Sequence, residues 1–165
     1  MKINKKISKY SVTIGSIIED IEVPSSSGKN WKISEVPTPW IVLYFYPKDS
    51  TPGCTLESSD FSRLFQQFKK NKATVYGISR DSIKSHLNFI NKQNYCLELL
   101  SDKEEKLCRA FDVIQEKNMY GNTVVGIERS TFILNKEGKI FGEWRKVKLD
   151  GHAADVLEFL KNECL

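Results

Sequence analysis

Cys54 is the residue of this sequence best placed for nucleophilic chemistry. It follows a short loop, residues 48–53, that joins an apolar run to a segment whose apolar residues recur at helical spacing. A cysteine at the start of a helix meets free backbone N–H groups and the positive end of the helix dipole, and both favour the thiolate. Because the thiolate is the nucleophilic form of cysteine, we expect sulfur chemistry at this position.

The residues beside Cys54 favour an oxygen substrate over a disulfide partner. Thr51 stands three residues before Cys54, where a C-x-x-C disulfide-exchange motif would carry its other cysteine. A threonine hydroxyl cannot form a disulfide, but it can hydrogen-bond a thiolate or a bound oxygen. Gly53 keeps bulk away from the sulfur. A thiolate held in this way is suited to attack a peroxide, which would leave a sulfenic acid on the protein.

Two buried strands and one long helix are predicted around Cys54. Residues 40–46, WIVLYFY, form a continuous apolar and aromatic run, which is typical of a strand buried on both faces. The helical spacing that follows predicts a helix from near Cys54 to near Lys70. Residues 73–78 predict the second buried strand.

The rest of the chain predicts further helices and strands. Asp81 or Ser82 is a suitable N-cap for a helix with Ile83, Leu87 and Ile90 as apolar positions and His86 on its surface. The other predicted elements are a hairpin of residues 21–23 and 31–33, a strand at 97–100, a helix from Ser101 through Phe111, a hairpin of strands 131–134 and 139–144, and a last helix opening at 150–152.

This order of elements predicts an α/β fold. Strands that alternate with helices, followed by a hairpin and a final helix, indicate a central mixed β-sheet flanked by helices, with an N-terminal β-hairpin. The order β-α-β and then β-β-α is the thioredoxin-like arrangement. A chain of 165 residues suits a single domain, so we expect one thioredoxin-like domain over residues 1–165.

The composition is that of an ordinary globular protein, with 40% hydrophobic and 28% charged residues. A net charge of +4 is too mild to predict a nucleic-acid partner, and basic residues such as Lys2, Lys5 and Lys6 are interpreted as solvated surface. No apolar run approaches the roughly 20 residues of a membrane helix, and the N-terminus lacks a secretory h-region, so a cytoplasmic protein is expected. With two histidines and no C-x-x-C pair, neither a metal site nor a cofactor is expected.

Three stretches of the chain carry a resemblance to a known family. Residues 44–55, YFYPKDSTPGCT, closely resemble the active-site stretch of peroxiredoxins of the bacterioferritin comigratory protein (Q) type. Residues 119–134, MYGNTVVGIERSTFIL, look like the family's segment with its active-site arginine. Residues 146–157, KVKLDGHAADVL, look like its C-terminal segment. The resemblance therefore covers nearly the whole chain.

The resemblance implies a thiol peroxidase and assigns its residues. Cys54 is then the peroxidatic cysteine, which attacks hydrogen peroxide or an organic hydroperoxide. Thr51 supplies the hydroxyl that contacts thiolate and peroxide, and Arg129 the cation that activates them. Pro47 shields the pocket, to which Gly53 also belongs. The resemblance further implies a monomer whose reductant is thioredoxin or another thiol.

The chain departs from the family pattern in how the sulfenic acid is resolved. Many members carry a resolving cysteine five residues after the peroxidatic one, and Ser59 stands there. Cys96 is the tentative alternative, whereas Cys108 is interpreted as a core thiol and Cys164 as a bystander at the chain end or a bridge to a partner subunit. The leading interpretation is a one-cysteine route, in which an external thiol reduces the sulfenic acid directly.

Two other functions remain open on this fold. The first is a disulfide oxidoreductase, against which the missing C-x-x-C pair argues. The second is a redox sensor or partner-binding module, which would react with peroxide at Cys54 without turnover with any reductant. Turnover assays distinguish both from a peroxidase.

Overall fold

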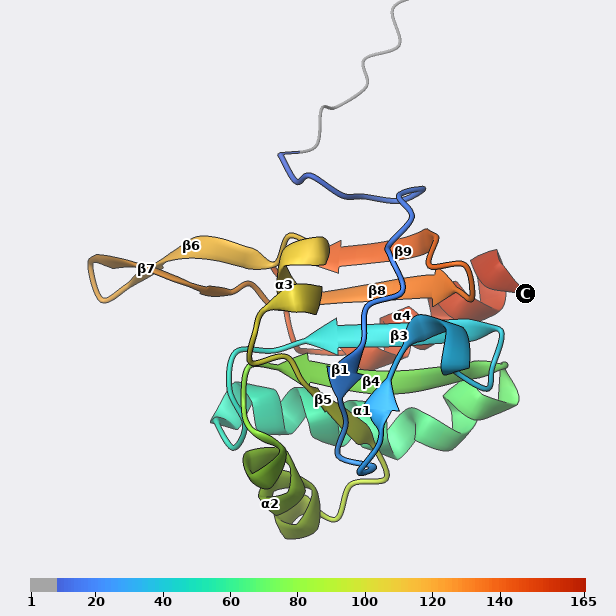
Figure 1. Ribbon diagram of the computed structural model, residues 1–165, viewed down its shortest axis with the longest axis horizontal. Helices are drawn as coiled ribbons and strands as arrows, with labels where there is room; N and C mark the ends of the chain where they lie inside the picture. The colour runs from blue at the N-terminus through green and yellow to red at the C-terminus, as the bar shows by residue number, and fades with distance from the viewer. Residues whose placement is uncertain (1–8) are drawn as a thin grey trace, which may run out of the picture.

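A five-stranded mixed sheet forms the centre of the protein, whose computed structural model describes residues 9–165. The order of its strands is β5 (Glu98–Ser101), β4 (Ala73–Ser79), β3 (Trp40–Phe45), β8 (Ser130–Asn135) and β9 (Ile140–Arg145). Strands β3, β4 and β5 run parallel, whereas β8 is antiparallel to β3 and β9 to β8 (Figure 1). The predicted mixed sheet and its C-terminal hairpin are confirmed. Lys2, Lys5 and Lys6 lie outside the described residues.

Three helices pack against one face of this sheet. They are α1 (Pro52–Lys70), α2 (Ile83–Gln93) and α4 (His152–Phe159), which continues into a π-helical turn. Val42 and Tyr44 of β3 point toward them and share a core cluster with their apolar residues. None of the helices within residues 9–165 is long and apolar enough to cross a membrane.

Shorter elements cover the opposite face. There, Leu43 packs in a second core cluster with side chains from the 3-10 turn η1 (Ile33–Glu35) and from α3 (Lys106–Ala110). The N-terminal hairpin of β1 (Val23–Pro24) and β2 (Asn30–Trp31) closes this side, which confirms the predicted hairpin with slightly different bounds. The α/β, thioredoxin-like fold predicted from the sequence is therefore present.

A third hairpin, which was not predicted from the sequence, projects from the body of the protein. Its strands are β6 (Ile114–Met119) and β7 (Asn122–Ile127), and within residues 9–165 they pair only with each other (Figure 1). Tyr120 and Gly121 form its tip, and both have positive φ, 51° and 79°. Such a two-residue turn matches the twist of an antiparallel hairpin.

The predicted helix from Ser101 through Phe111 is wrong in its start and in its cap. Ser101 is the last residue of β5, and α3 begins only at Lys106. The carboxylate of Asp102 accepts hydrogen bonds from the backbone N–H groups of Leu107 and Cys108. The N-cap position of this short helix is Glu105, and the acceptor for its first N–H groups is the side chain of Asp102, next in sequence to the predicted serine.

The buried face of α2 also differs from the prediction. Ser82 is the N-cap, as one of the two predicted candidates, and its hydroxyl accepts a hydrogen bond from the N–H of Ser85. However, Leu87 is 41% exposed, whereas His86 is fully buried beside Phe89. The prediction of a surface His86 is wrong, because the inward face of the helix includes His86 and Phe89, three residues apart.

Candidate active site

The pairing of β3 with β8 brings the predicted active-site residues together. Phe45, at the end of β3, lies opposite Ser130, at the start of β8. Because β8 is antiparallel to β3, Arg129, just before β8, lies at the end of the sheet where β3 stops. The loop into α1 starts at the same end. Arg129 therefore meets Cys54 although 75 positions separate them in the chain.

Cys54 lies in the first turn of α1 with its sulfur covered. The residue is 1% exposed, and Nη2 of Arg129 donates a hydrogen bond to its Sγ at 3.4 Å. Thr51 is the N-cap of α1, and Pro52 fills the first helical position, where no N–H is needed. The guanidinium and the helix N-terminus both stabilise a negative charge on the sulfur. The site is thus suited to hold a thiolate.

Glu57 completes the site and was not predicted. Nη1 of Arg129 donates to its Oε1 at 2.7 Å, while its Oε2 is buried with no hydrogen-bond partner among residues 9–165. Burial raises the pKa of Glu57 to about 7, although the charge of Arg129 and the hydrogen bond from it pull the pKa down. Glu57 follows Cys54 by three residues, so helical spacing placed it on the same face of α1. That spacing was the available signal in the sequence.

Thr51 lies beside the site, but its hydroxyl proton is engaged within the loop. Thr51 Oγ1 donates to the carbonyl oxygen of Lys48 at 2.9 Å. The backbone carbonyl of Thr51 accepts from both the N–H and the hydroxyl of Thr55, which fixes the first turn of α1. With this proton engaged, Thr51 Oγ1 can only accept a further hydrogen bond.

Gly53 provides the space in which Arg129 reaches the sulfur. A Cβ atom at Gly53 would lie 3.3 Å from Nη2 of Arg129 and 3.3 Å from Cδ1 of Leu149. The residue therefore keeps bulk away from the guanidinium as well as from Cys54. Pro47 is half-buried and directly follows the last core residue of this segment, Tyr46.

Lys117 of β6 connects the projecting hairpin with the site electrostatically. Partial burial and the charge of Arg129 lower the pKa of Lys117, while the charge of Cys54 acts in the opposite direction. The hairpin therefore adds a second basic residue to the surroundings of the sulfur. Sequence analysis did not single out Lys117, because its strand was not predicted.

Cys96 contacts α1 at Ser62, farther along the helix than Cys54. Its Sγ donates to the carbonyl oxygen of Ser62 at 3.3 Å, and its N–H donates to the Ser62 hydroxyl at 3.1 Å. Ser62 follows Cys54 by eight residues, a rise of about 12 Å along the helix. A disulfide requires Cα atoms within about 7 Å. The structure therefore does not bring the tentative resolving cysteine to Cys54.

The other two cysteines occupy different surroundings. Cys108 is fully buried, and burial together with the carboxylate of Asp102 raises the pKa of its thiol well above its ordinary value. Cys164 is partly exposed, and burial and Glu163 raise the pKa of its thiol. Neither is hydrogen-bonded to Cys54 in the described part of the chain. The interpretation of Cys108 as a core thiol agrees with its place in the second core cluster.

No metal-binding arrangement is present within residues 9–165. Groups of three or more His, Cys, Asp or Glu side chains that could hold a metal ion do not occur there. The expectation that the protein needs neither metal nor cofactor stays a prediction. The groups that the structure places at the site are a thiol, a guanidinium and a buried carboxylate.

Comparisons with known proteins agree with this geometry. The model of the AhpC/TSA family matches residues 14–141. The chain is 54% identical over 142 residues to Peroxiredoxin Bcp of Xanthomonas campestris pv. campestris, covering 86% of this chain and 89% of that protein. It is 44% identical over 152 residues to Peroxiredoxin Bcp of Bacillus subtilis, covering 92% and 97% of the two chains.

Solved structures similar to this chain are also peroxiredoxins. A structure of Xanthomonas campestris Peroxiredoxin Q matches with a TM-score of 0.85 at 49% identity and covers 96% of this chain and 100% of that chain. Peroxiredoxin 6 of Arenicola marina, at 18% identity, shares the fold with a TM-score of 0.76. The resemblance found in the sequence is thereby confirmed. The chain belongs to the AhpC/TSA family, as a peroxiredoxin of the bacterioferritin comigratory protein (Q) type.

Proposed function

We propose that this protein is a thiol-dependent peroxidase that reduces hydrogen peroxide and organic hydroperoxides through the Cys54 thiolate. The observation that carries the proposal is the fork of Arg129, with Nη2 on Cys54 Sγ at 3.4 Å and Nη1 on Glu57 Oε1 at 2.7 Å. A bacterioferritin comigratory protein of Xanthomonas campestris, 48% identical, is described by its alkyl peroxide reduction activity. That description supports the extension to organic hydroperoxides.

In the first step, the Cys54 thiolate attacks the terminal oxygen of the hydroperoxide. The S–O bond forms as the O–O bond breaks, and the electron pair of the broken bond leaves with the other oxygen. That oxygen takes a proton and becomes water or an alcohol, while the sulfur is oxidised to a sulfenic acid. The guanidinium of Arg129 stabilises the charge that develops on the oxygens.

Thr51 has an orienting part in this proposal. Because its hydroxyl proton is donated to the carbonyl of Lys48, its lone pairs are available to accept the O–H of a hydroperoxide. Such a contact aligns the O–O bond with the sulfur, which is the geometry that in-line attack requires. Pro47 and Gly53 bound the pocket and limit what else can approach Cys54.

In the second step, thiols return the sulfenic acid to the thiol. A thiolate attacks the Cys54 sulfur and water leaves, which gives a mixed disulfide. A second thiolate attacks the reductant sulfur of the mixed disulfide, Cys54 leaves as its thiolate, and the two reductant sulfurs leave joined as a disulfide. We propose thioredoxin or a small thiol as reductant, on the one-cysteine route, because the sulfur of Cys96 is bonded to Ser62 about two turns along α1.

The proposal includes a monomeric, cytoplasmic protein. Its four free thiols are typical of proteins in reducing compartments. Sedimentation equilibrium of the reduced and oxidised protein tests the monomer, and fractionation of cells tests the location. No nucleic-acid partner is proposed, because the net charge is only +4.

One experiment tests the peroxidase directly. Reduced wild type and Cys54→Ser, with Cys96→Ser and Cys164→Ser as matched controls, receive one equivalent of hydrogen peroxide, and peroxide loss and intact masses are followed. Cys54→Ser is expected to lose consumption, while both controls retain it. Consumption by Cys54→Ser at the wild-type rate contradicts the proposal. Oxidation of Cys54 without turnover by any thiol indicates a sensor, and insulin reduction indicates a disulfide oxidoreductase.

A further inference from the structure

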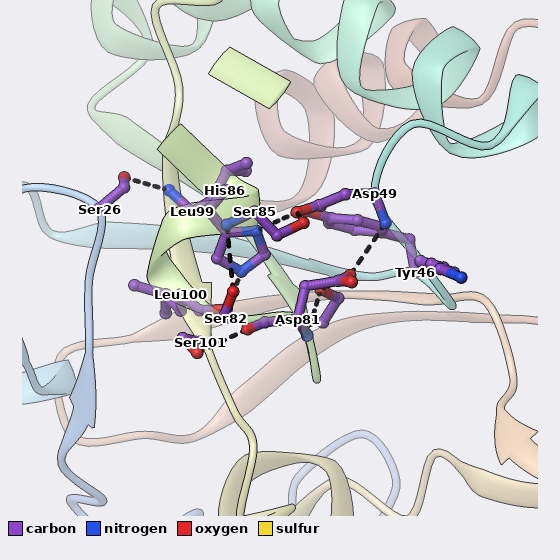
Figure 2. A network of polar contacts seen from close by, with 12 residues as sticks. Ser26, Tyr46, Asp49, Asp81, Ser82, Ser85, His86, Leu99, Leu100 and Ser101 are labelled. Atoms are coloured by element: carbon purple, nitrogen blue, oxygen red, sulfur yellow. Dashed lines mark hydrogen bonds and ion pairs between the residues drawn. The ribbon is translucent and has the colours of Figure 1, made fainter. Parts of the chain in front are cut away.

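A buried hydrogen-bond network joins the loop before Cys54 to α2 and β5 (Figure 2). His86 Nδ1 lies 2.8 Å from Asp49 Oδ2, and His86 Nε2 lies 2.9 Å from the carbonyl oxygen of Leu100. The Tyr46 hydroxyl donates to Asp49 Oδ1 at 2.6 Å, and the Ser85 hydroxyl donates to Asp49 Oδ2 at 2.8 Å. His86 is fully buried and Asp49 is 5% exposed. Each polar side-chain atom of the pair therefore has a protein partner instead of water.

The partners determine where the protons of this pair lie. A carbonyl oxygen only accepts, so Nε2 of His86 carries a proton. Burial alone would raise the pKa of Asp49, but the hydrogen bond and charge of His86, together with the hydroxyls of Tyr46 and Ser85, outweigh it and hold the pKa below its ordinary value. Asp49 is thus held as a carboxylate by these partners. The pair joins the loop to α2 through a buried hydrogen bond.

The same aspartate also anchors the backbone of the loop. The N–H of Asp49 donates to Asp81 Oδ2 at 2.9 Å, and the Ser79 hydroxyl donates to the same oxygen. The next residue, Ser50, has a φ of 64°, in the left-handed region that a residue with a Cβ rarely adopts. Thr51, the N-cap of α1, follows directly. A strained residue persists only where its surroundings hold it, and the contacts of Asp49 hold the backbone directly before Ser50.

We propose that the Asp49–His86 pair is a positioning device that holds the loop 48–53 and the first turn of α1 in the conformation required for attack on peroxide, with Cys54 covered. The inference rests on the proposed peroxidase function. Both residues act through the loop, since their hydrogen bonds go to Tyr46, Asp81, Ser85 and Leu100. Removing one partner leaves a buried polar group of the other without its hydrogen bond, a cost that release of the loop to solvent relieves.

Release of the loop has two effects of opposite sign. Peroxide attack slows, because Cys54, Thr51 and Arg129 lose their alignment. A bulky thiol reagent, in contrast, reaches Cys54 faster, because the closed loop leaves only 1% of the residue exposed. A residue that only contributes to overall stability would change the labelling of all buried thiols together. Cys108, also fully buried, reports on such general unfolding.

The test uses the full chain with Cys96→Ser and Cys164→Ser, which leaves Cys54 and Cys108 as thiols. His86→Gln and Asp49→Asn are added separately. The second-order rate constant with hydrogen peroxide is measured by stopped flow, and the rate of reaction with dithiobis(nitrobenzoic acid) is assigned by peptide mass. We expect peroxide oxidation to slow by about tenfold or more, labelling of Cys54 to accelerate by a similar factor, and Cys108 to stay unlabelled.

The matched control is Asp102→Asn, which removes another buried carboxylate that caps α3 instead of holding the loop. It should leave both rates at Cys54 unchanged. If Asp49→Asn does not fold, Ser85→Ala removes one of the hydroxyl hydrogen bonds to the Asp49 carboxylate and should shift both rates in the same directions by about threefold.

Several outcomes overturn the inference. These are wild-type rates in His86→Gln, labelling of Cys108 in step with Cys54, or the same changes in Asp102→Asn. Wild type that fails to consume peroxide contradicts the proposed function instead, and the labelling rates still report on the loop.

Discussion

At Arg129, the shape of the guanidinium matters as much as its charge. One nitrogen donates to Glu57 and the other to Cys54, so the planar group reaches both at once. A lysine carries a point charge without this fixed fork. We expect Arg129→Lys to retain the fold and to lower the second-order rate constant with hydrogen peroxide by roughly 100-fold, as measured by stopped flow.

Arg109→Lys is the control for this substitution. Arg109 lies on α3, is largely exposed, and pairs with Glu105 one turn away. Its replacement should leave the peroxide rate unchanged. A full rate in Arg129→Lys would show that charge alone is sufficient at the sulfur.

Glu57 gives the protein a predictable dependence of stability on pH. Its pKa is raised by burial from 4.5 to about 7, so the folded state binds this proton more tightly than the unfolded state. The protonated Glu57 therefore stabilises the folded state fully below pH 4.5, and this stabilisation is lost as the pH rises through 7. We therefore expect the free energy of unfolding of wild type, measured by urea titration, to fall by up to about 3 kcal/mol relative to that of Glu57→Gln between pH 4.5 and 7.5.

The comparison with Glu57→Gln is necessary because His152 titrates in the same range. Burial lowers the pKa of His152 to about 4, so its contribution to stability rises with pH, opposite in sign to that of Glu57. Both proteins share His152, and their difference isolates Glu57. Parallel pH profiles would contradict the prediction.

The site residues that could be predicted from the residues alone are those whose positions follow from their spacing along the chain. Cys54 and Thr51 follow a buried strand and start a helix, and Arg129 was identified through the resemblance. Glu57 and His86 were not identified as buried, because polar side chains become buried only through contacts with distant residues, here Arg129 and Asp49. Helical spacing places Glu57 on the face of α1 that carries Cys54, but the burial of Glu57 and of His86 depends on tertiary contacts that the spacing does not show.

Gly77 of β4 leaves room for the side chain of Tyr44 of β3, which in turn contacts α1. A Cβ atom at Gly77 would lie 2.6 Å from the hydroxyl oxygen of Tyr44 and 2.7 Å from Cδ2 of Leu99. Tyr44 is fully buried and its hydroxyl is hydrogen-bonded to Ser58 of α1. We expect Gly77→Ala to lower the free energy of unfolding by about 2 kcal/mol, measured by urea titration.

Gly126→Ala is the matched control for this prediction. Among the described residues, a Cβ atom at Gly126, in β7, would meet only Nη2 of Arg80, at an ordinary 3.6 Å. Its stability should be within about 0.5 kcal/mol of wild type. Equal losses in the two variants would mean that the glycine backbone, and not the contact with Tyr44, accounts for the effect.

The elements were predictable where apolar residues follow one period. The run at residues 40–46 and the helical spacing after Cys54 gave β3 and α1 nearly to the residue. The hairpin of β6 and β7 was missed, because its strands are mostly exposed and show no alternation of apolar and polar residues. Its turn, Tyr120-Gly121, was the one local signal.

On the scale of the whole molecule, Cys96 lies too far from Cys54 for a disulfide between them in this conformation. Cys54 is under the loop at the start of α1, and Cys96 is bonded to Ser62 farther along that helix. Tyr95, next to Cys96, is hydrogen-bonded to Ser59 and to the carbonyl of Thr55. Moving Cys96 to Cys54 would break these contacts together.

The whole-molecule prediction is therefore that Cys96 is dispensable for turnover. Cys96→Ser is expected to keep its rate with hydrogen peroxide and dithiothreitol within about twofold of wild type, because an external thiol attacks the Cys54 sulfenic acid. Peptide masses after one equivalent of peroxide should show one added oxygen on Cys54, with Cys164→Ser as the control. A Cys54–Cys96 disulfide, with turnover lost in Cys96→Ser, would instead establish an internal route that requires the contacts of Tyr95 to open.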